Sequence, residues 1–296
     1  MIKTALPTAA YRRSERTEPA FSVLAGKGGT ILRHLVLIFF SLVVLFPFLW
    51  MFFAAFKPEE DVFLPGFHLL PSRWVFTNFA DAWNAAPFLY FFRNSLVCAA
   101  IVVGSQLVTC SLAAYGFAKM NFRGRTLLFS LLIASMMVPG EASIIPNFLL
   151  AKNLHLLDSF LGLAMPSLTS VFGIFLMRQS FMSIPDDLLN AAKIDGCNEL
   201  GAFWHVGLPC AKSSLATLSI FGFLGAWNEY MWPMIVTNKN NMRTLQIGLK
   251  YMISPDLGPQ WPMIMAASTM ILLPVLLLFV CLQKYFIDGM VHAGIK

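Results

Sequence analysis

Charged residues are scarce in this chain. They make up 12% of its 296 residues, whereas hydrophobic residues make up 57%, and a soluble domain usually carries about 25% charged residues. Because this number of charged residues is too small to cover a water-facing surface, we exclude a soluble globular fold for most of the chain. The aromatic content of 14% also excludes a disordered chain, because disordered segments are poor in aromatic residues.

The sequence also lacks the patterns of common catalytic, metal and nucleotide sites. The five cysteines form no C-x-x-C pair, the five histidines are isolated from one another, and neither H-E-x-x-H nor G-x-S-x-G occurs. No phosphate-binding G-x-x-x-x-G-K-[ST] loop is present, and the string 26–30 (GKGGT) has the wrong spacing. We therefore predict no catalytic residues, no metal, no disulfide and no cofactor of the chain's own, and thus not an enzyme.

Long apolar runs are what the chain does have. Six runs approach or exceed the roughly 20 residues that a membrane-spanning helix needs, and none alternates polar and apolar residues as a membrane strand does. The fold class predicted is all-α, a polytopic membrane protein with six transmembrane helices. The runs are Leu35–Phe56, Asn94–Ala118, Thr126–Leu150, Ser159–Met177, Ser213–Asn238 and Met263–Gln283.

The distribution of basic residues predicts the orientation. The side that would carry both termini holds twice as many Lys and Arg residues as the other side, and such an excess usually marks the cytoplasm. We expect a multi-pass protein of the cytoplasmic (inner) membrane with both termini inside. The first run is too long for a signal peptide and follows about 30 mostly polar residues, so we interpret it as an uncleaved anchor.

The loop of residues 183–212 (SIPDDLLNAAKIDGCNELGAFWHVGLPCAK) has an internal pattern. Ser183, Pro185 and two aspartates suit a helix start, and Gly196 suits its end. Asn198 suits the cap of a second short helix, in which Phe203 and Trp204 would anchor the loop against the bundle. The loop therefore predicts a helix, a glycine turn and a helix outside the bilayer. Two interpretations stay open here, an amphipathic loop resting on lipid headgroups and a docking element for another protein.

Part of this loop resembles the EAA motif of ABC importer permeases. That motif reads E-A-A, three residues, G, nine residues and I-x-L-P. Its counterparts here begin with Asn190 in place of the glutamate and carry Val206 in place of the isoleucine; the matching residues are Ala191, Ala192, Gly196, Leu208 and Pro209.

Two further stretches strengthen the resemblance. Residues 227–233 (WNEYMWP) are similar to a stretch of carbohydrate importer permeases, and Phe286, Gly289, Met290 and Gly294 resemble the end of those chains. The chain thus looks like the second permease of a maltose-type or glycerol-phosphate-type uptake system.

The resemblance implies a set of partners and a mechanism. A second permease would complete the pore, a dimer of cytoplasmic ATPase subunits would bind ATP, and an external binding protein would deliver the solute. The loop 183–212, called the coupling loop below, would dock on the ATPase. The residues implied in coupling are Asp187, Asn190, Ala191, Ala192, Asp195, Gly196, Leu208 and Pro209.

The same resemblance suggests how the chain is divided. We expect a cytoplasmic tail (1–30), a first crossing with its outer loop (31–89), a five-helix permease core (90–290) and a C-terminal tail (291–296). Because Asn190 cannot form an ion pair, docking is expected to rest on shape and on Asp186, Asp187 or Asp195.

Two carboxylates lie inside the predicted crossings. Glu141 follows Pro139 and Gly140, where we expect a broken helix, and Glu229 lies in the fifth run next to Asn228. Charges at membrane depth are costly and usually face a cavity or a partner. We consider Glu141, Asn228 and Glu229 candidates for the substrate path of a hydroxylated solute. The alternative role is a hydrogen bond to a second subunit or to a freed backbone group.

The predicted function is a permease subunit of an ATP-driven importer for a sugar or polyol, glycerol phosphate included. Without Lys or Arg in the six runs, a neutral solute is mildly favoured. The alternative is a self-sufficient secondary carrier, although the two halves of the chain show no repeat of the kind that carriers often have.

Overall fold

The computed structural model describes residues 27–62, 64–66, 68–254 and 258–294. Most of the tail predicted at 1–30 lies outside these residues, and Lys27 already belongs to the first helix. The chain divides into two units, Met1–Trp50 and Met51–Lys296, which we describe separately. The first unit contributes most of α1, Lys27–Ala54.

The second unit contains two long helices, α3 (Phe88–Lys119) and α14 (Trp261–Gly294). Together with α1 they are the helices of the described residues that are by themselves long and apolar enough to cross a membrane. Three further pairs of helices pass the same test together but are bent, so the described part of the chain has up to six crossings if each pair counts as one. The six predicted runs therefore correspond to three continuous helices and to segments of three bent pairs.

The first bent pair confirms the predicted break near Glu141. Its first segment, Arg125–Met137, consists of α4 (Arg125–Ala134) and the 3₁₀ turn η3 (Ser135–Met137). Its second segment, Gly140–Asn153, consists of the 3₁₀ turn η4 (Gly140–Ser143) and α5 (Ile144–Asn153). The two segments meet at an angle of 95°. Val138 is extended, with ψ 118°, as a residue before proline favours. The second pair is bent by 56°. It joins Phe160–Ser167, which consists of α6 (Phe160–Ala164) and the 3₁₀ turn η5 (Met165–Ser167), to α7 (Val171–Met182).

The fifth run, predicted as one helix over Ser213–Asn238, is interrupted. Helix α11 (Lys212–Asn228) ends before an extended Glu229, and α12 (Met231–Val236) begins after it. Pro233 explains the interruption, because its ring would clash with the carbonyl of Glu229 four residues earlier in a continuous helix. The bent pair instead joins α11, at 80°, to the end of the coupling loop, Glu199–Cys210.

The remaining elements are short and lie in connecting segments. In the coupling loop α8 (Asp186–Ile194) is followed by α9 (Glu199–Ala202), the π turn η6 (Phe203–Gly207) and α10 (Leu208–Cys210). The others are η2 (Glu59–Asp61), α2 (Thr77–Asn84), η7 (Asn240–Met242), α13 (Leu245–Gly248), η8 (Leu249–Met252) and the antiparallel strands β1 (Ile253–Ser254) and β2 (Gly258–Pro259).

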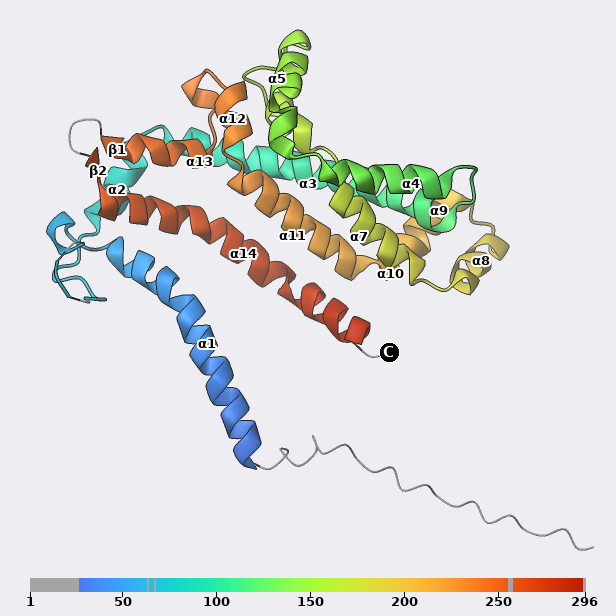
Figure 1. The fold of residues 1–296 in the computed structure, drawn as a ribbon, viewed down its shortest axis with the longest axis horizontal. Coiled ribbons are helices and arrows are strands. Elements are labelled where there is room, and N and C mark those ends of the chain that lie inside the picture. Colours follow the sequence, from blue (N-terminus) through green and yellow to red (C-terminus); the bar gives the residue numbers. More distant parts are fainter. Residues whose placement is uncertain (1–26, 63, 67, 255–257, 295–296) are drawn as a thin grey trace, which may run out of the picture. The chain divides into compact units, whose positions relative to one another are not determined.

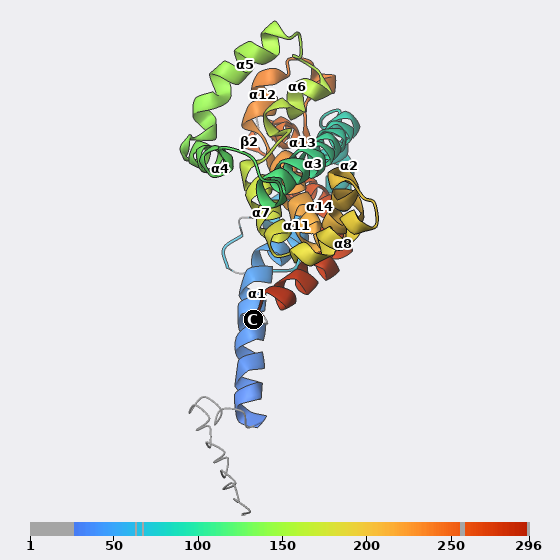
Figure 2. The same ribbon diagram turned by 90° about the vertical axis from the view of Figure 1, so that its right-hand side faces the viewer.

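Helix α3 organises the second unit. Its first turns pack with α2 and α13 and share a hydrophobic cluster with residues of α14, and its last turns pack with α7 and the coupling loop. Within this unit α8 lies beyond the C-terminal end of α3, whereas α2 and the β1–β2 hairpin lie at the opposite end (Figure 1), and Figure 2 views the unit from the α8 side. The two ends of α3 therefore carry different extramembrane segments.

Close packing and side-chain hydrogen bonds hold α3 against its neighbours. A Cβ at Gly173 of α7 would approach Cys110 Sγ of α3 to 3.0 Å, the tight approach that small residues allow in membrane bundles. Where α6–η5 and α7 meet, Gln106 Nε2 donates to Ser167 O at 2.8 Å and Ser105 Oγ to Leu168 O at 2.7 Å. These bonds satisfy carbonyls that the bend releases from helical pairing.

Candidate docking and translocation sites

The first half of the coupling loop is the helix α8, as its sequence predicts. Pro185 stands at its N-cap with ψ 135°, and Asp186 and Asp187 occupy the first turn, where the helix dipole favours negative charge. Ser183 does not cap this helix, since its hydroxyl donates to Ser180 O at 2.7 Å. Leu189 and Ala192, three residues apart, form the buried face of α8.

Helix α8 ends at the predicted glycine. Gly196 has φ +93°, a conformation that costs other L residues energy. Its N–H donates to Lys193 O at 3.0 Å and the N–H of Cys197 donates to Ala192 O at 2.9 Å. These two bonds form a Schellman motif, in which the last carbonyls of the helix are satisfied by the reversing chain.

The second half of the loop is less regular than one short helix. Asn198 Oδ1 accepts the N–H of Gly201 at 2.7 Å, which confirms the predicted cap. After α9 the chain widens into the π turn η6 and re-forms a helical turn at Leu208 and Pro209. The helix–glycine–helix pattern is therefore confirmed, with a π turn that the sequence did not indicate.

The predicted coupling residues divide between an exposed face and the core. Exposed residues of the set are Asp187, Asn190, Ala191, Asp195, Gly196 and Pro209, whereas Ala192 is buried and Leu208 is half-buried. An exposed apolar residue that we did not single out, Ile194, lies on α8 with 87% of its surface accessible. The sequence indicated this exposure, because Ile194 follows Asn190 by four residues and residues at that spacing share a helix face.

Phe203 and Trp204, predicted to anchor the loop, have different environments. Phe203 is 2% exposed, and its ring centroid lies 5.2 Å from that of Tyr115 and 6.1 Å from that of Phe181. Trp204 is 56% exposed. Of the two, Phe203 therefore anchors the coupling loop and Trp204 does not, because successive residues of a helix point to different sides.

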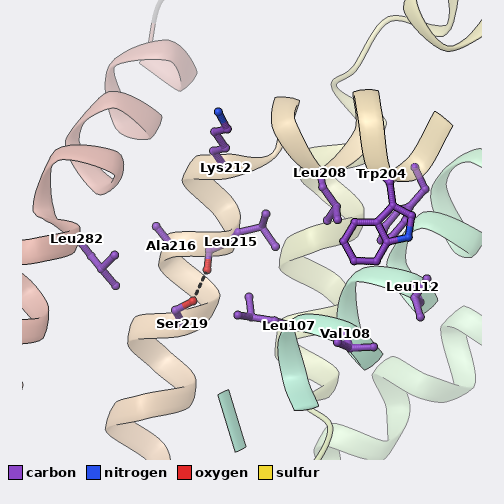
Figure 3. A pocket seen from close by; sticks show the side chains of 11 residues that line it. Leu107, Val108, Leu112, Trp204, Leu208, Lys212, Leu215, Ala216, Ser219 and Leu282 are labelled. Carbon is purple, nitrogen blue, oxygen red and sulfur yellow. Dashed lines mark hydrogen bonds between the residues drawn. The ribbon is translucent and has the colours of Figure 1, made fainter. Parts of the chain in front are cut away.

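Trp204 instead lines an apolar pocket of about 470 Å³. Figure 3 shows its ring near Leu208, with residues of α3 and α11 and, on the other side, Leu282 of α14. The hydroxyl of Ser219, one of the polar groups that line the pocket, is already engaged, because it donates to Leu215 O of its own helix at 2.9 Å. A hydroxylated solute would find few partners in this pocket, so it is not a candidate for the solute path.

Two ion pairs hold the coupling loop, and the sequence had indicated neither. Lys119, at the end of α3, contacts Asp186 Oδ1 at 2.6 Å and donates to Ile184 O at 2.7 Å. The hydrogen bond from Lys119 and its charge lower the pKa of Asp186. Asp186 therefore has a partner in its own chain, which weakens its expected role in docking.

The second ion pair joins α8 to α9. Lys193 Nζ lies 2.6 Å from Glu199 Oε1, and both side chains are partly exposed. The hydrogen bond to Glu199 raises the pKa of Lys193. This pair spans the glycine turn, so it helps to hold the two helices of the loop together.

The three substrate-path candidates lie at the two helix breaks described above. Glu141 is exposed in η4, and Asn228 is the exposed last residue of α11. Glu229 Oε1 accepts the N–H of Trp232 at 3.1 Å, so this carboxylate satisfies a backbone group that the interruption frees. That contact is one of the two roles that the sequence left open for Glu229.

The described residues contain no group of three or more His, Cys, Asp or Glu side chains placed to hold a metal ion. Cys98 and Cys110 are buried free thiols. The predicted absence of metal and cofactor stays a prediction.

The family of binding-protein-dependent transport system inner membrane components matches residues 106–292. The chain belongs to this family. It is 35% identical over 274 residues to the sn-glycerol-3-phosphate transport system permease protein UgpE of Yersinia pestis, covering 90% of this chain and 98% of that protein. It is also 35% identical to the arabinooligosaccharides transport system permease protein AraQ of Bacillus subtilis, covering 95% and 99%.

A solved structure has the same fold. A chain of a bacterial ABC transporter involved in the import of the acidic polysaccharide alginate superposes with a TM-score of 0.76 and 26% identity, over 91% of this chain and 99% of that one. The chain is therefore a membrane permease subunit of an ABC-type importer, and its family is one of transport permeases rather than enzymes. The predicted family, fold class and general function are confirmed.

Proposed function

We propose that this permease forms half of the pore of an ATP-driven importer for a sugar or related polyol, with a polyol phosphate such as glycerol phosphate in the same solute class. The single observation that carries the proposal is the likeness, over nine-tenths or more of the chain, to permeases named for glycerol phosphate and for arabinooligosaccharides. A second permease completes the pore, and an extracytoplasmic binding protein delivers the solute.

Energy comes from a dimer of cytoplasmic ATPase subunits, which bind the ATP. The coupling loop supports this part of the proposal, since α8 presents an exposed face at one end of the unit and is tied to α3 through Lys119. Together with the buried Leu189 and Ala192, which lie in the same hydrophobic cluster as Tyr115 of α3, this contact couples a movement of α8 to a membrane-spanning helix. Both chain termini lie on the ATPase side, as the excess of basic residues indicates.

Helix α7 contains one basic residue, Arg178, just past the predicted fourth run. Its Nε donates to Phe117 O at 3.2 Å, and its guanidinium lies 4.1 Å from the ring centroid of Phe129. Because Arg178 is engaged in its own chain, it supports no phosphate site. The leaning toward a neutral solute therefore stands as part of the proposal.

The test is uptake into proteoliposomes that contain this chain with its second permease, the ATPase subunits and the binding protein. We expect uptake of a labelled oligosaccharide or polyol when ATP is inside, and none from an ion gradient alone. Omitting the binding protein or the ATPase should abolish uptake. Uptake by this chain alone, driven by a proton or sodium gradient, would establish the secondary carrier instead.

A panel of solutes sharpens the substrate class. Glycerol phosphate, a neutral oligosaccharide and a neutral polyol compete against the labelled solute in the same vesicles. If an amino acid or a peptide competes and no solute of the panel does, the proposed solute class is wrong, but the chain still belongs to the family.

A further inference from the structure

A polar pocket of about 430 Å³ opens beside α8, between the end of α3, the start of α4 and α9. Its charged lining consists of three cations, Lys119, Arg125 and Lys193, and two acids, Asp186 and Glu199. Both acids are already engaged, at 2.6 Å, by Lys119 and Lys193. Arg125 Nη1 donates to the neutral oxygens Met120 O and Asn121 Oδ1, at 3.1 and 3.2 Å. The lining therefore carries an excess of positive charge.

Two polar groups of the lining add hydrogen-bond donors. Tyr115 is 5% exposed, and its buried hydroxyl has no hydrogen-bond partner within the described part of the chain. Asn190 lines the same pocket from the exposed face of α8. A buried hydroxyl without a partner is costly, and a phenol, an amide and a guanidinium together suit a ligand that accepts hydrogen bonds.

The residue at position 190 sets the charge balance of the pocket, because a third acid here would offset the third cation. A glutamate here would lie one helical turn from Lys193, at the i, i+3 spacing that allows an ion pair, and would place a carboxylate of the chain itself in the pocket. Asn190 leaves the pocket without that carboxylate. A cationic group of a partner protein would then be repelled by the net positive charge of the pocket, whereas an anionic group would accept hydrogen bonds from its lining.

We propose, on the basis of the proposed function, that this pocket receives a carboxylate side chain of the cytoplasmic ATPase subunit. The contact thus has the opposite sign to one in which the permease supplies the acid at position 190. Arg125 and Lys193 face the incoming carboxylate, Asn190 donates from the rim, and Lys119 lies deeper with 9% of its side chain exposed.

Asn190→Glu tests the sign directly, with Asn190→Gln as the neutral control of nearly equal size. In the assembled complex we expect Asn190→Glu to weaken ATPase association about tenfold, an effect at the lower end of that of one interfacial charge pair. Asn190→Gln should change it less than about twofold. Equal or tighter association with Asn190→Glu would overturn the proposal, because a basic partner group or no charged group would then face the pocket.

A carbodiimide reaction identifies the partner group, since it joins an amine to a carboxylate in direct contact. We expect a cross-linked peptide between Lys193 and an Asp or Glu of the ATPase, lost in Lys193→Arg, which keeps the charge and removes the amine. Protection of Lys193 from acetylation by inorganic phosphate, without a cross-link to the ATPase, would show a free-anion site and overturn the assignment to a partner side chain.

Failure of the proposed function is distinguishable from failure of this inference. If the unaltered chain associates with no ATPase subunit, the importer assignment of the coupling loop fails. If it associates and drives uptake but Asn190→Glu and the cross-link behave otherwise than stated, the pocket assignment alone fails.

Discussion

The two ends of α3 are attached to their neighbouring segments by different chemistry. At its N-terminal end, Asn94 is fully buried and its Nδ2 donates to Asn241 O at 2.7 Å and to Arg243 O at 3.0 Å, while Ser95 Oγ accepts from Leu245 N at 2.9 Å. At its C-terminal end the coupling loop is attached by the buried contact of Phe203 with Tyr115 and by the ion pair of Lys119 with Asp186, whose side chain is 78% exposed.

This difference separates a permanent attachment from one that leaves a face free. Buried neutral hydrogen bonds are costly to break, because the groups left behind have no water. An ion pair whose acid is largely exposed contributes little to stability, and the acid is accessible to other charges. The attachment of segment 240–245 therefore suits a static connection, whereas the coupling loop combines an anchored side with an exposed side suited to a partner.

The aromatic anchor of the coupling loop gives the largest expected effect. Phe203→Ala removes a buried ring from the Tyr115–Phe181 cluster and should lower the free energy of unfolding by about 3–5 kcal/mol. The matched control is Trp204→Ala, which removes a 56% exposed ring and should cost less than half as much. Thermal unfolding in detergent measures both, and equal losses would mean that the neighbouring residues share the anchoring role.

The buried amide at the opposite end should rank second. Asn94→Ala leaves the carbonyls of Asn241 and Arg243 without this donor, and should lower the free energy of unfolding by about 1–3 kcal/mol. Asn84→Ala, at an exposed asparagine, is the control and should change little. If Asn94→Ala unfolds at the same temperature as the unaltered chain, the contrast between the two ends does not hold.

The glycine turn affects function more than overall stability. Gly196→Val forces a β-branched residue to φ +93° at a place where an added Cβ meets no atom within 4 Å, so the strain of roughly 1–2 kcal/mol is in the backbone. We expect loss of ATPase co-purification and of uptake with the bundle still folded.

Gly104→Ala serves as the control for Gly196→Val, since its site is also open and lacks a positive φ. It should leave co-purification and uptake intact. Unchanged association and uptake in both Gly196→Val and Gly196→Asp would contradict the docking role of the coupling loop.

The ion pair of Asp186 should give the smallest effect. Its pKa lies below the usual 3.8 in the folded chain, so its contribution is present at neutral pH and is lost as the pH falls below about 4. The protection of residues 184–195 against hydrogen exchange, measured relative to the intrinsic exchange rate at each pH, should fall in that range and not between pH 7 and 5. Asp186→Asn should show the reduced protection already at neutral pH and little further change, whereas unaltered protection would mean that the ion pair does not hold α8.

Much of the coupling loop could be predicted from local sequence. The proline and aspartates at the start of α8, the glycine at its end and the cap at Asn198 act within one helical turn, so a single sequence contains their whole cause. The break before Glu141 likewise follows from Pro139. The interruption at Glu229 was missed because a run of apolar residues was counted without the effect of Pro233 on the carbonyl four residues earlier.

What could not be predicted depends on residues far apart in the chain. Lys119 and Asp186 are 67 residues apart and Asn94 and Asn241 are 147 apart, and nothing in the local pattern of either member indicates its partner. The exposure of Trp204 beside the buried Phe203 was also set by which side of the loop meets α3. The sequence therefore predicted the local backbone of the coupling loop well and the environments of its side chains less well, while the roles of the site residues stay predictions.

Local and compositional physics determined the class of the protein from its sequence: apolar length for the crossings, scarcity of charge for the membrane, and turn chemistry for the shape of α8. The tertiary structure alone decided which of the loop's charges are engaged and which face a pocket. An ion pair or a cavity forms only where folding brings distant groups together, and that geometry is a property of the packed chain rather than of any segment in it.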